Sequence, residues 1–435
     1  MKQTLEALKL GQLIGSKTLK LACALKEFPE EILTLSETLE VLDLSDNQLS
    51  TLPGTISQLK KLRIIFFARN NFTEFPKVLA KCPTLTMIGF KSNQIQIVPE
   101  NAFPSVLKWL ILTDNKIKAL PKSIGDCLQL QKCALAGNLI EVLPASMANC
   151  INLELLRVSA NRLKLLPDWL FTLPKLSWIA FGGNPGAHQI QLNNDLESVN
   201  WVDFSIKELL GEGASGFISK ANWKSKNKDV AIKVFKGAVT SDGLPEDEMQ
   251  ISIAAGAHKS LIPILGRIKA HPEGKKGLIM KLITSSYINL GHPPSLETCT
   301  RDVFDDTCLF SFSDLLNIAK HISSVCMQLH KKGINHGDLY AHNILINEKA
   351  ECLLGDFGAA TFYDVSSKTS HNIERIEVRA FGCLLEDILN FVPINDSDKI
   401  HYNKWLKLIE NCMRFHVESR PSFHQIFDKL TTPDF

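Results

Sequence analysis

LEVLDLSDNQLSTLP, at residues 39–53, decides the fold of the first half of the chain, because this stretch recurs along it. The later copies read LRIIFFARNNFTEFP, LTMIGFKSNQIQIVP, LKWLILTDNKIKALP, LQKCALAGNLIEVLP and LELLRVSANRLKLLP, and a partial copy, LSWIAFGGNP, follows them. Each copy carries an asparagine at the same place in the repeat, 22 or 23 residues after that of the previous copy. These asparagines are Asn47, Asn70, Asn93, Asn115, Asn138, Asn161 and Asn184. A fixed period of this length predicts a stack of similar coils.

Within each copy, residues before the asparagine alternate between apolar and polar, which predicts one short strand per coil. In the first copy Leu42 and Leu44 should point into the stack, while Val41, Asp43 and Ser45 point out of it. We expect each asparagine side chain to bond main-chain groups of neighbouring coils that would otherwise be buried without partners. The coils should be stable only as a stack, since no single unit buries a core.

This period and its asparagine resemble the leucine-rich-repeat family over about the first 190 residues. The resemblance implies an α/β leucine-rich-repeat solenoid at 17–190, with residues 1–16 as a helical cap. Its outward strand positions should form a concave face that binds a protein partner, and the alternative is a solvated face without a ligand. Apolar Phe67 and Trp109 on this face favour binding. The positions assigned to the face are Asp43, Ser45, Ile65, Phe67, Arg69, Met87, Gly89, Lys91, Trp109, Ile111, Thr113, Lys132, Ala134, Arg157, Ser159, Trp178 and Ala180.

Composition narrows the class of protein. The 435 residues carry a net charge of +2, so no global field attracts nucleic acid or an anionic membrane. The eleven cysteines are scattered singly without metal-type spacing, which favours buried thiols in a reducing compartment over disulfides. No window has the length and hydrophobicity of a membrane span. We therefore expect a cytoplasmic protein that has neither a membrane span nor a nucleic-acid partner.

Near residue 190 the period stops, and the polar stretch at 191–203 is predicted to be a linker. After it, FSIKELLGEGASGFISKANW and DVAIKVF read as strands. Gly211, Gly213 and Gly216 form a glycine-rich turn that is weak evidence alone. Lys233 stands 17 positions after Gly216, at the end of an apolar strand, where a lysine is costly to bury without a partner.

Two further motifs follow in the second half. HGDLYAHN places Asn343 five positions after Asp338, and Asp356-Phe357-Gly358 begins 13 residues later. With the glycine-rich turn and Lys233, these motifs resemble the protein-kinase family in both order and spacing, over about 204–431. The resemblance implies an α+β bilobal fold at 204–435, with a small lobe at 204–280 and a large lobe at 284–435.

The resemblance also implies a site for ATP and Mg2+. Asp338 would accept the proton of the attacking hydroxyl, and Asn343 and Asp356 would hold the metal. Lys233 would position the nucleotide and pair with Glu248, with Glu246 as the less favoured partner. The predicted nucleotide-binding set is Leu210, Gly211, Glu212, Gly213, Ala214, Ser215, Gly216, Phe217, Ile218, Ala231, Lys233, Glu248, Met280 and Leu282.

The chain departs from the family pattern at several places. Gly337 replaces the arginine that in many kinases holds a phosphorylated activation loop, which predicts a site that is arranged without such phosphorylation. Glu377 replaces an aspartate, and Tyr340 stands where serine/threonine kinases usually carry lysine. No Ala-Pro-Glu is present, so Arg420 lacks the glutamate with which it normally pairs.

We therefore predict an ATP- and Mg2+-dependent protein kinase directed at serine or threonine of a protein substrate, with a leucine-rich-repeat region that recruits a partner. Two alternatives remain open at this point. Only about twenty residues lie between Gly358 and the next predicted helix, so the platform that binds a peptide substrate in the family is shortened. His-Gly-Asp followed by asparagine also resembles kinase-like small-molecule phosphotransferases, which manage without this platform. A catalytically silent scaffold would keep the fold alone.

Overall fold

The computed structural model describes the chain except residues 1–2, 189–195, 214, 238–239, 241 and 434. The described residues form two compact units. Unit 1 comprises Met1–Leu173 with Asn184–Gly186, and unit 2 comprises Pro174–Gly183 with Ala187–Phe435. The domain boundaries drawn from the sequence stay a prediction.

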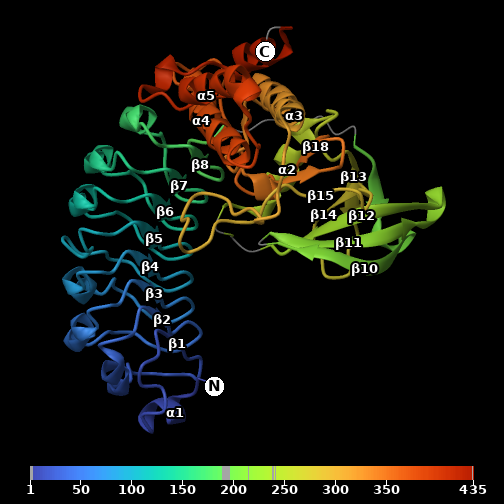
Figure 1. Cartoon of the computed structure of the whole chain (residues 1–435). Helices are drawn as coiled ribbons and strands as arrows, with labels where there is room; N and C mark the ends of the chain where they lie inside the picture. The colour runs from blue at the N-terminus through green and yellow to red at the C-terminus, as the bar shows by residue number, and fades with distance from the viewer. Residues whose placement is uncertain (1–2, 189–195, 214, 238–239, 241, 434) are drawn as a thin grey trace. The chain divides into compact units, whose positions relative to one another are not determined.

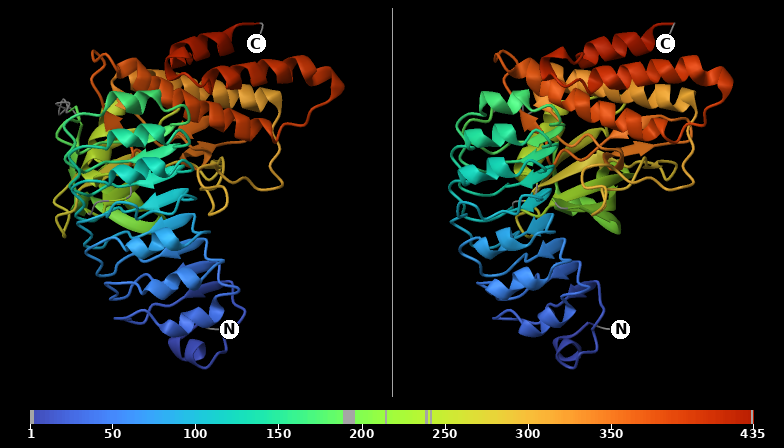
Figure 2. Two further views of the ribbon diagram at one scale, coloured as in Figure 1. Left: turned by 90° about the vertical axis from the view of Figure 1, so that its left-hand side faces the viewer. Right: turned by 60° about the vertical axis from the view of Figure 1, so that its left-hand side comes forward.

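Unit 1 is a stack of short coils, most of them made of a strand and a 3-10 turn (Figure 1), and the coil that begins with Met87–Gly89 has a turn without 3-10 structure. Strands line one side of the stack and the turns line the other in both views of Figure 2. Strands β1 to β7 pair in parallel in sequence order. Their bounds are β1 Thr18–Lys20, β2 Val41–Asp43, β3 Ile64–Phe66, β4 Met87–Gly89, β5 Trp109–Ile111, β6 Lys132–Ala134 and β7 Leu155–Arg157. The turns are η1 Glu30–Leu35, η2 Gly54–Gln58, η3 Lys77–Lys81, η4 Lys122–Asp126, η5 Ala145–Asn149 and η6 Asp168–Thr172.

The asparagines behave as the repeat predicts. Asn70 donates from Nδ2 to the Leu44 carbonyl of the preceding coil at 2.9 Å, and its Oδ1 accepts from Leu49 N at 2.9 Å. The same pattern recurs for the other asparagines of the series, all of them buried. Each coil thus satisfies main-chain groups of the coil before it, which is why the residue is needed once per period.

One repeat was misread by one residue in the sequence. Ile65 and Phe67 were expected on the outward face, but both are fully buried. The Phe67 ring stacks on Phe90 with centroids 5.2 Å apart. Because Ile65 pairs in register with Leu42, the outward side chain of this strand is Phe66. A run of apolar residues hides the period-two alternation, and the error follows from that.

The N-terminal cap holds a single short helix, α1 Leu5–Lys9, whose N-terminus is capped by the Thr4 side chain. Its buried residues, Ala7 and Leu8, close the first coil with apolar surface. A terminal coil of a repeat stack needs such cover because it has no neighbour on one side.

The first part of unit 2 is a six-stranded sheet of order β10-β11-β12-β14-β13-β9 with one helix. A core of apolar side chains, among them Phe204, Trp223 and Ile279, fills one face of it. The stretch expected as a linker ends in β9, which pairs in parallel with β13. The bounds are β9 Ser198–Asn200, η7 Trp201–Asp203, β10 Phe204–Glu212, β11 Gly216–Trp223, η8 Lys224–Lys226, β12 Lys228–Phe235, α2 Pro245–Ala255, β13 Ile264–Lys269 and β14 Gly277–Lys281.

The remainder of unit 2 is mainly helical. Helix α4 is buried along most of its length and forms the centre of this part. Its elements are β15 Ile288–Asn289, α3 Phe312–Lys331, β16 Ile334–Asn335, η9 Ala341–Asn343, β17 Ile344–Ile346, β18 Cys352–Leu354, β19 Thr361–Phe362, α4 Ser370–Leu389, η10 Asp396–Asp398, α5 Lys399–Cys412, η11 Val417–Ser419 and α6 Phe423–Thr431. Among the described helices, none combines the length and the apolar character that a bilayer crossing requires.

Candidate active site

Lys233 lies on β12, in the middle of the six-stranded sheet, with Leu278 of β14 and Ile218 of β11 beside it. Its ammonium group forms an ion pair with the Glu248 carboxylate of α2. Only 12% of the Lys233 side chain and 3% of the Glu248 side chain are exposed. A charge so far from water needs a partner, and α2 supplies it.

The choice between two glutamates is settled by geometry. Glu246, two residues earlier on α2, forms an exposed ion pair with Lys276 instead. Burial raises the pKa of the Glu248 carboxyl, and the nearby Lys233 charge opposes that rise. Asp356 adds a further raising effect, which places its carboxylate in the electrostatic surroundings of this pair.

The glycine-rich turn joins β10 to β11. Gly213 N donates to the Gly216 carbonyl at 2.9 Å, and Lys236 holds the turn through Glu212 Oε1 at 2.7 Å. A Cβ atom on Gly216 would lie 2.5 Å from the Val234 carbonyl oxygen, so this position accepts no other residue without movement. Beyond the chain neighbours, no atom lies within 4 Å of the place that a Cβ would take on Gly211 or Gly213, so the turn offers room at these two positions for a phosphate.

The other predicted nucleotide-binding residues lie around this sheet. Leu210 is exposed on β10, Phe217 and Ile218 begin β11, and Ala231 of β12 pairs with Met280 of β14. The remaining members are Gly211 in β10, Ser215 next to the turn, and Leu282 just after β14. Ala214 lies outside the described residues.

A hairpin brings the two remaining motifs together. Strands β17 and β18 are antiparallel, with Ile344 opposite Leu354, so the residues before β17 and after β18 meet at one end. Gly355 N donates to the Asn343 carbonyl at 2.9 Å. The Asn343 side-chain amide donates to both the main-chain oxygen and Oδ2 of Asp338, each at 2.9 Å.

Asp356 has an uncommon main-chain conformation. Its φ is 49°, in the left-handed region that a residue with a side chain seldom adopts. Gly358 N donates to its Oδ1 at 3.1 Å and so holds the carboxylate in place. Strain of this kind costs about 1 to 3 kcal/mol and collects at functional sites.

Glu377 of α4 holds the start of the loop at 336–343, which carries Asp338 and is the candidate catalytic loop. Its carboxylate accepts main-chain N–H groups of His336 at 3.2 Å and Gly337 at 2.6 Å, and it bonds the His330 ring at 2.8 Å. Burial alone would raise the pKa of Glu377, but the His330 hydrogen bond and these other contacts hold it below its usual value. The glutamate therefore serves the main chain of the loop as a buried anion.

Sequence reasoning missed Asp302. Its Oδ2 accepts Ala341 N, and its Oδ1 bonds His342 Nδ1 at 2.7 Å, so it holds the second half of the catalytic loop. The His342 pKa is raised: burial opposes this, but the Asp302 hydrogen bond and the charges of Asp338 and Asp356 prevail. Asp302 stands 39 residues before Ala341 in an irregular stretch, so no motif marks it.

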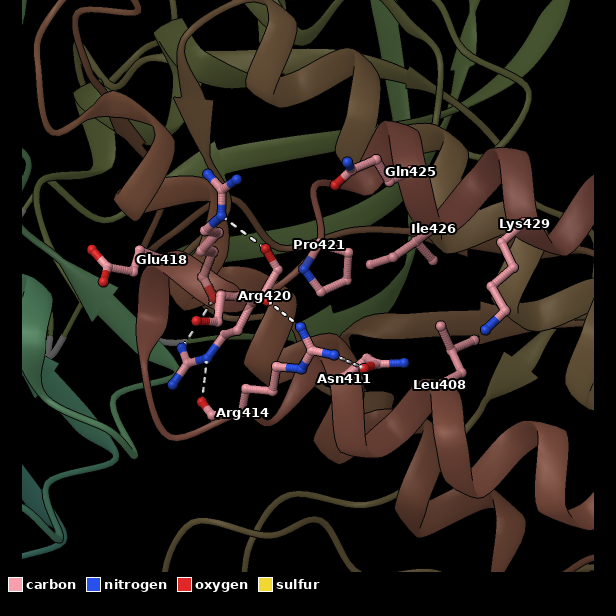
Figure 3. Close-up of a pocket in the computed structure, with 11 residues that line it drawn as sticks. Leu408, Asn411, Arg414, Glu418, Arg420, Pro421, Gln425, Ile426 and Lys429 are labelled. Atoms are coloured by element: carbon pink, nitrogen blue, oxygen red, sulfur yellow. Dashed lines mark hydrogen bonds between the residues drawn. The ribbon is translucent and has the colours of Figure 1, made fainter.

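Arg420 is bound by carbonyl groups rather than by the glutamate that the family supplies. Its guanidinium donates to the main-chain oxygens of Arg414, Arg375 and Pro174 at 3.0, 3.1 and 2.7 Å. Figure 3 shows it at a pocket of about 460 Å3, where Arg414 meets Asn411. Burial lowers the pKa of Arg420 to about 9. None of the residues predicted to act on ATP lines this pocket.

Comparisons with known proteins agree with these features. Residues 204–402 match the family of protein tyrosine and serine/threonine kinases, and residues 37–95 match the leucine rich repeat family. Fibroblast growth factor receptor 1 of Xenopus laevis is 26% identical over 277 residues, covering 51% of this chain and 33% of the receptor. The tyrosine-protein kinase transforming protein Abl of Abelson murine leukemia virus is 24% identical over 290 residues, covering 57% of this chain and 37% of that protein.

A serine/threonine relative matches as well. A probable cyclin-dependent serine/threonine-protein kinase of Dictyostelium discoideum is 26% identical over 183 residues, covering 42% of this chain and 27% of the kinase. The chain thus spans roughly a third of the length of the curated relatives it matches. The family matches confirm both halves of the fold class expected from the sequence.

Proposed function

We propose that this chain, which joins a leucine-rich-repeat region to a protein kinase domain, transfers the γ-phosphoryl group of ATP to a hydroxyl of a protein substrate. One observation carries the proposal. Lys233, Asp338 and Asp356 come from distant segments, yet the residues that link them lie close together. Glu248 pairs with Lys233, and a Cβ atom on Gly358 would lie 3.1 Å from Asp356 Oδ1 and 3.8 Å from Glu248 Oε2. Beside Asp356, Gly355 N donates to the Asn343 carbonyl, and the Asn343 amide donates to Asp338.

The nucleotide end of the site depends on Lys233. Glu248 pairs with its ammonium group, so the position of that group is fixed before a triphosphate arrives. A fixed cation next to a glycine-rich turn neutralises phosphate oxygens without reorganisation, which is how kinases obtain most of their rate.

The acceptor end depends on Asp338. The attacking hydroxyl oxygen forms a bond to the γ-phosphorus, the bond from that phosphorus to the β,γ-bridging oxygen breaks, and the hydroxyl proton passes to the Asp338 carboxylate. The Asn343 amide donates to Asp338 Oδ2 at 2.9 Å and so helps to fix the orientation of the carboxylate. Asp338 would increase the rate of transfer more by orienting the hydroxyl than by its strength as a base.

Magnesium fits this site by its donor set. The Asn343 amide oxygen and the Asp356 carboxylate are the hard oxygen ligands that Mg2+ prefers, and the remaining positions suit phosphate and water. When bound, the ion would neutralise charge on the phosphates. Among the described residues no cluster of three His, Cys, Asp or Glu side chains forms a metal site on its own, which agrees with a metal that arrives with the nucleotide.

Incubation of the purified chain with γ-labelled ATP and Mg2+ tests the proposal. Label should appear on protein, and Asp338→Asn should reduce turnover by about 1000-fold, within the range of general-base effects. Glu351→Gln, an exposed change on the same hairpin, is the matched control and should keep wild-type turnover. Equal turnover by wild type and Asp338→Asn would leave a scaffold without catalysis.

We propose serine or threonine as the acceptor, in line with the serine/threonine kinase of Dictyostelium among the relatives. A tyrosine-protein kinase is also among the relatives, so tyrosine is the acceptor that the test must exclude. Phosphoamino-acid analysis of the labelled protein separates the two: phosphotyrosine as the main product would overturn the acceptor class while leaving the kinase activity in place.

A small-molecule phosphotransferase is the second candidate, and two observations favour it. Only a short stretch separates Gly358 from the start of α4 at Ser370, and Arg420 binds carbonyl groups instead of a platform glutamate. Labelled small product without labelled protein would establish this reading.

For the repeat region we propose recruitment of a protein partner through the outward face of β1 to β7. The face offers Phe66, and Trp109 with the Lys132 ammonium 4.1 Å from its ring centroid. Aromatic and cationic groups of this kind are frequent binding determinants. Pulldown with the full chain and with Phe66→Glu tests the idea, since a partner retained equally by both does not use this face.

We propose a cytoplasmic location. All eleven cysteines are free thiols, and burial raises the pKa of several of them, for example that of Cys82 to about 11. Buried, protonated thiols are typical of reducing compartments. Imaging of the tagged chain tests this, and a secreted chain would contradict it.

A further inference from the structure

The segment Pro174–Gly183 belongs to the repeats by sequence but to unit 2 by its contacts. It contains most of the last partial repeat copy and the strand β8 Trp178–Ala180. The strand is buried throughout, with Trp178 only 2% exposed. A strand of the repeat is therefore part of unit 2, and its bonds show which segments of that unit it supports.

Its main contact is with the catalytic loop. Trp178 Nε1 donates to the Leu339 carbonyl at 3.0 Å, and its indole stacks on the Tyr340 ring with centroids 4.3 Å apart and planes 8° apart. Leu339 and Tyr340 directly follow Asp338. The segment therefore fixes the main chain that carries the proposed proton acceptor.

The adjacent residue holds the other side of the loop. The Ile179 carbonyl accepts from the Asn335 side chain at 2.9 Å. A Cβ atom on Gly337 would lie 2.5 Å from that same carbonyl oxygen, and Gly337 has φ +71°. The glycine that stands in place of the family's arginine is thus the residue that lets β8 approach the loop.

Three further bonds tie the ends of the segment down. The Ser177 hydroxyl accepts from Arg379 of α4 at 2.6 Å, and Phe181 N donates to Thr361 Oγ1 of β19 at 3.3 Å. The Pro174 carbonyl accepts from Arg420 at 2.7 Å. Bonds to separate parts of unit 2 make the segment a fixed support.

We propose that Pro174–Gly183 is a built-in positioning element for the catalytic loop, with Trp178 as its chief positioning residue. It does what an arginine bound to a phosphorylated loop does in kinases that carry His-Arg-Asp, so the loop is held without phosphorylation. The inference rests on the proposed phosphotransfer function, because it assigns the loop its task. Buried aromatic and main-chain contacts give the rigidity that positioning of an acceptor hydroxyl demands.

Full-chain variants at Trp178 test this. Trp178→Ala should lower kcat at least about tenfold and leave the Kd for Mg-ATP within about twofold, because Lys233 and Glu248 are untouched. Trp178→Phe keeps the ring stack on Tyr340 and loses the N–H donor, so its kcat should lie between the kcat of Trp178→Ala and that of wild type. Trp405→Ala is the matched control: it removes an equally buried tryptophan of unit 2, packed on Phe435, and should leave kcat unchanged.

Hydrogen exchange separates this inference from the phosphotransfer proposal. Trp178→Ala should speed exchange of the main-chain amides at 336–343, with no change caused by Trp405→Ala. If wild type turns over no ATP, the phosphotransfer proposal fails, and the exchange experiment still decides whether the segment orders the loop. Wild-type kcat and wild-type exchange in Trp178→Ala overturn the inference. If Trp178→Ala does not fold, the same two results in Trp178→Phe overturn it.

Restoring the family's residue gives an opposite test. Gly337→Arg should reduce turnover by more than about 100-fold, because its Cβ meets the Ile179 carbonyl at 2.5 Å and the left-handed φ strains any side chain. Phosphatase treatment of wild type should leave turnover unchanged. Increased turnover in Gly337→Arg, or loss of wild-type turnover after phosphatase, overturns the inference.

Discussion

The asparagine series of unit 1 and the side chains that hold the candidate catalytic residues of unit 2, such as Glu248 and Glu377, are both buried polar groups. They differ in how far apart along the sequence the bonded residues lie, and in whether the arrangement repeats. Each asparagine bonds main-chain groups no more than 26 residues away, and the next coil repeats the arrangement. In unit 2 the arrangement does not repeat: Lys233 pairs with Glu248, and Glu377 accepts from the Gly337 amide, 40 residues earlier in the chain. The first pattern is a structural device used many times, and the second is a single site in which each member has its own task.

The difference predicts how the two regions respond to loss of one group. A repeated device spreads its contribution over many coils, so one loss should weaken unit 1 without touching chemistry. A site made of unique groups should lose turnover when one is removed even if the fold is kept.

Among the variants that test this contrast, the largest effect is expected for Lys233→Met. Lys233→Met should lower ATP turnover by roughly 100-fold or more, because it removes the fixed cation for the phosphates. Lys276→Met is the matched control, since Lys276 also pairs with a glutamate of α2 but is more than half exposed. Steady-state kinetics with both variants measure the contrast.

Lys233→Met also leaves Glu248 buried without its cation, which costs stability. The double change Lys233→Met with Glu248→Gln removes that charge and should recover the unfolding midpoint while turnover stays low. Recovery of turnover together with stability would show that Lys233 is structural, and the contrast between the regions would disappear.

The proximity of the candidate catalytic residues could be predicted from sequence because the motifs fix residue types and spacings, and the roles of these residues stay a prediction. Asp338, Asn343 and Asp356 stand in motifs, and the hairpin β17 to β18 that joins them is short enough to read. The repeat period likewise gave the strands and the asparagine bonds. The alternation was misread at Ile65 and Phe67, where apolar residues run together, and several other residues assigned to the outward face are buried, among them Thr113, Ser159 and Trp178.

The supports of the site could not be predicted. Trp178 is more than 150 residues from Leu339, and within the repeat it occupies an ordinary outward position. Asp302 lies in an irregular stretch with no period or motif. Long-range packing decides such contacts, and a single sequence carries no local signal of it.

A smaller effect, on stability alone, is expected in the asparagine series. Asn70→Ala should lower the free energy of unfolding of unit 1 by about 2 kcal/mol, because the Leu44 carbonyl and the Leu49 amide lose their buried partner. Asn71→Ala changes the next residue, whose amide makes only an exposed 3.4 Å bond, and should be nearly neutral. Urea unfolding followed by far-UV signal measures both.

Turnover should be unchanged in both asparagine variants. Equal destabilisation by Asn70→Ala and Asn71→Ala would mean that the bonds of Asn70 to the Leu44 carbonyl and the Leu49 amide add no stability of their own. A selective loss of turnover in Asn70→Ala would show that the two regions are not separate in function.

The smallest effect is a pH dependence at His342, where a structural bond lies inside the catalytic set. The His342 pKa is raised above its usual value of 6.5, against burial, by the Asp302 hydrogen bond and by the charges of Asp338 and Asp356. A raised folded pKa means that the protonated ring stabilises the native state. This contribution is complete below the unfolded pKa and is lost as the pH rises through the folded pKa.

Urea unfolding of wild type and His342→Gln from about pH 5.5 to about pH 8.5 measures this contribution. The stability advantage of wild type should be greatest at the acid end and should shrink as the pH rises. His424→Gln is the control, because His424 pairs with Asp428 on the exposed surface of α6 and should show little dependence. An advantage that grows with pH would mean that the folded pKa of His342 lies below its unfolded value, and the ring would then donate to Asp302 as a neutral imidazole.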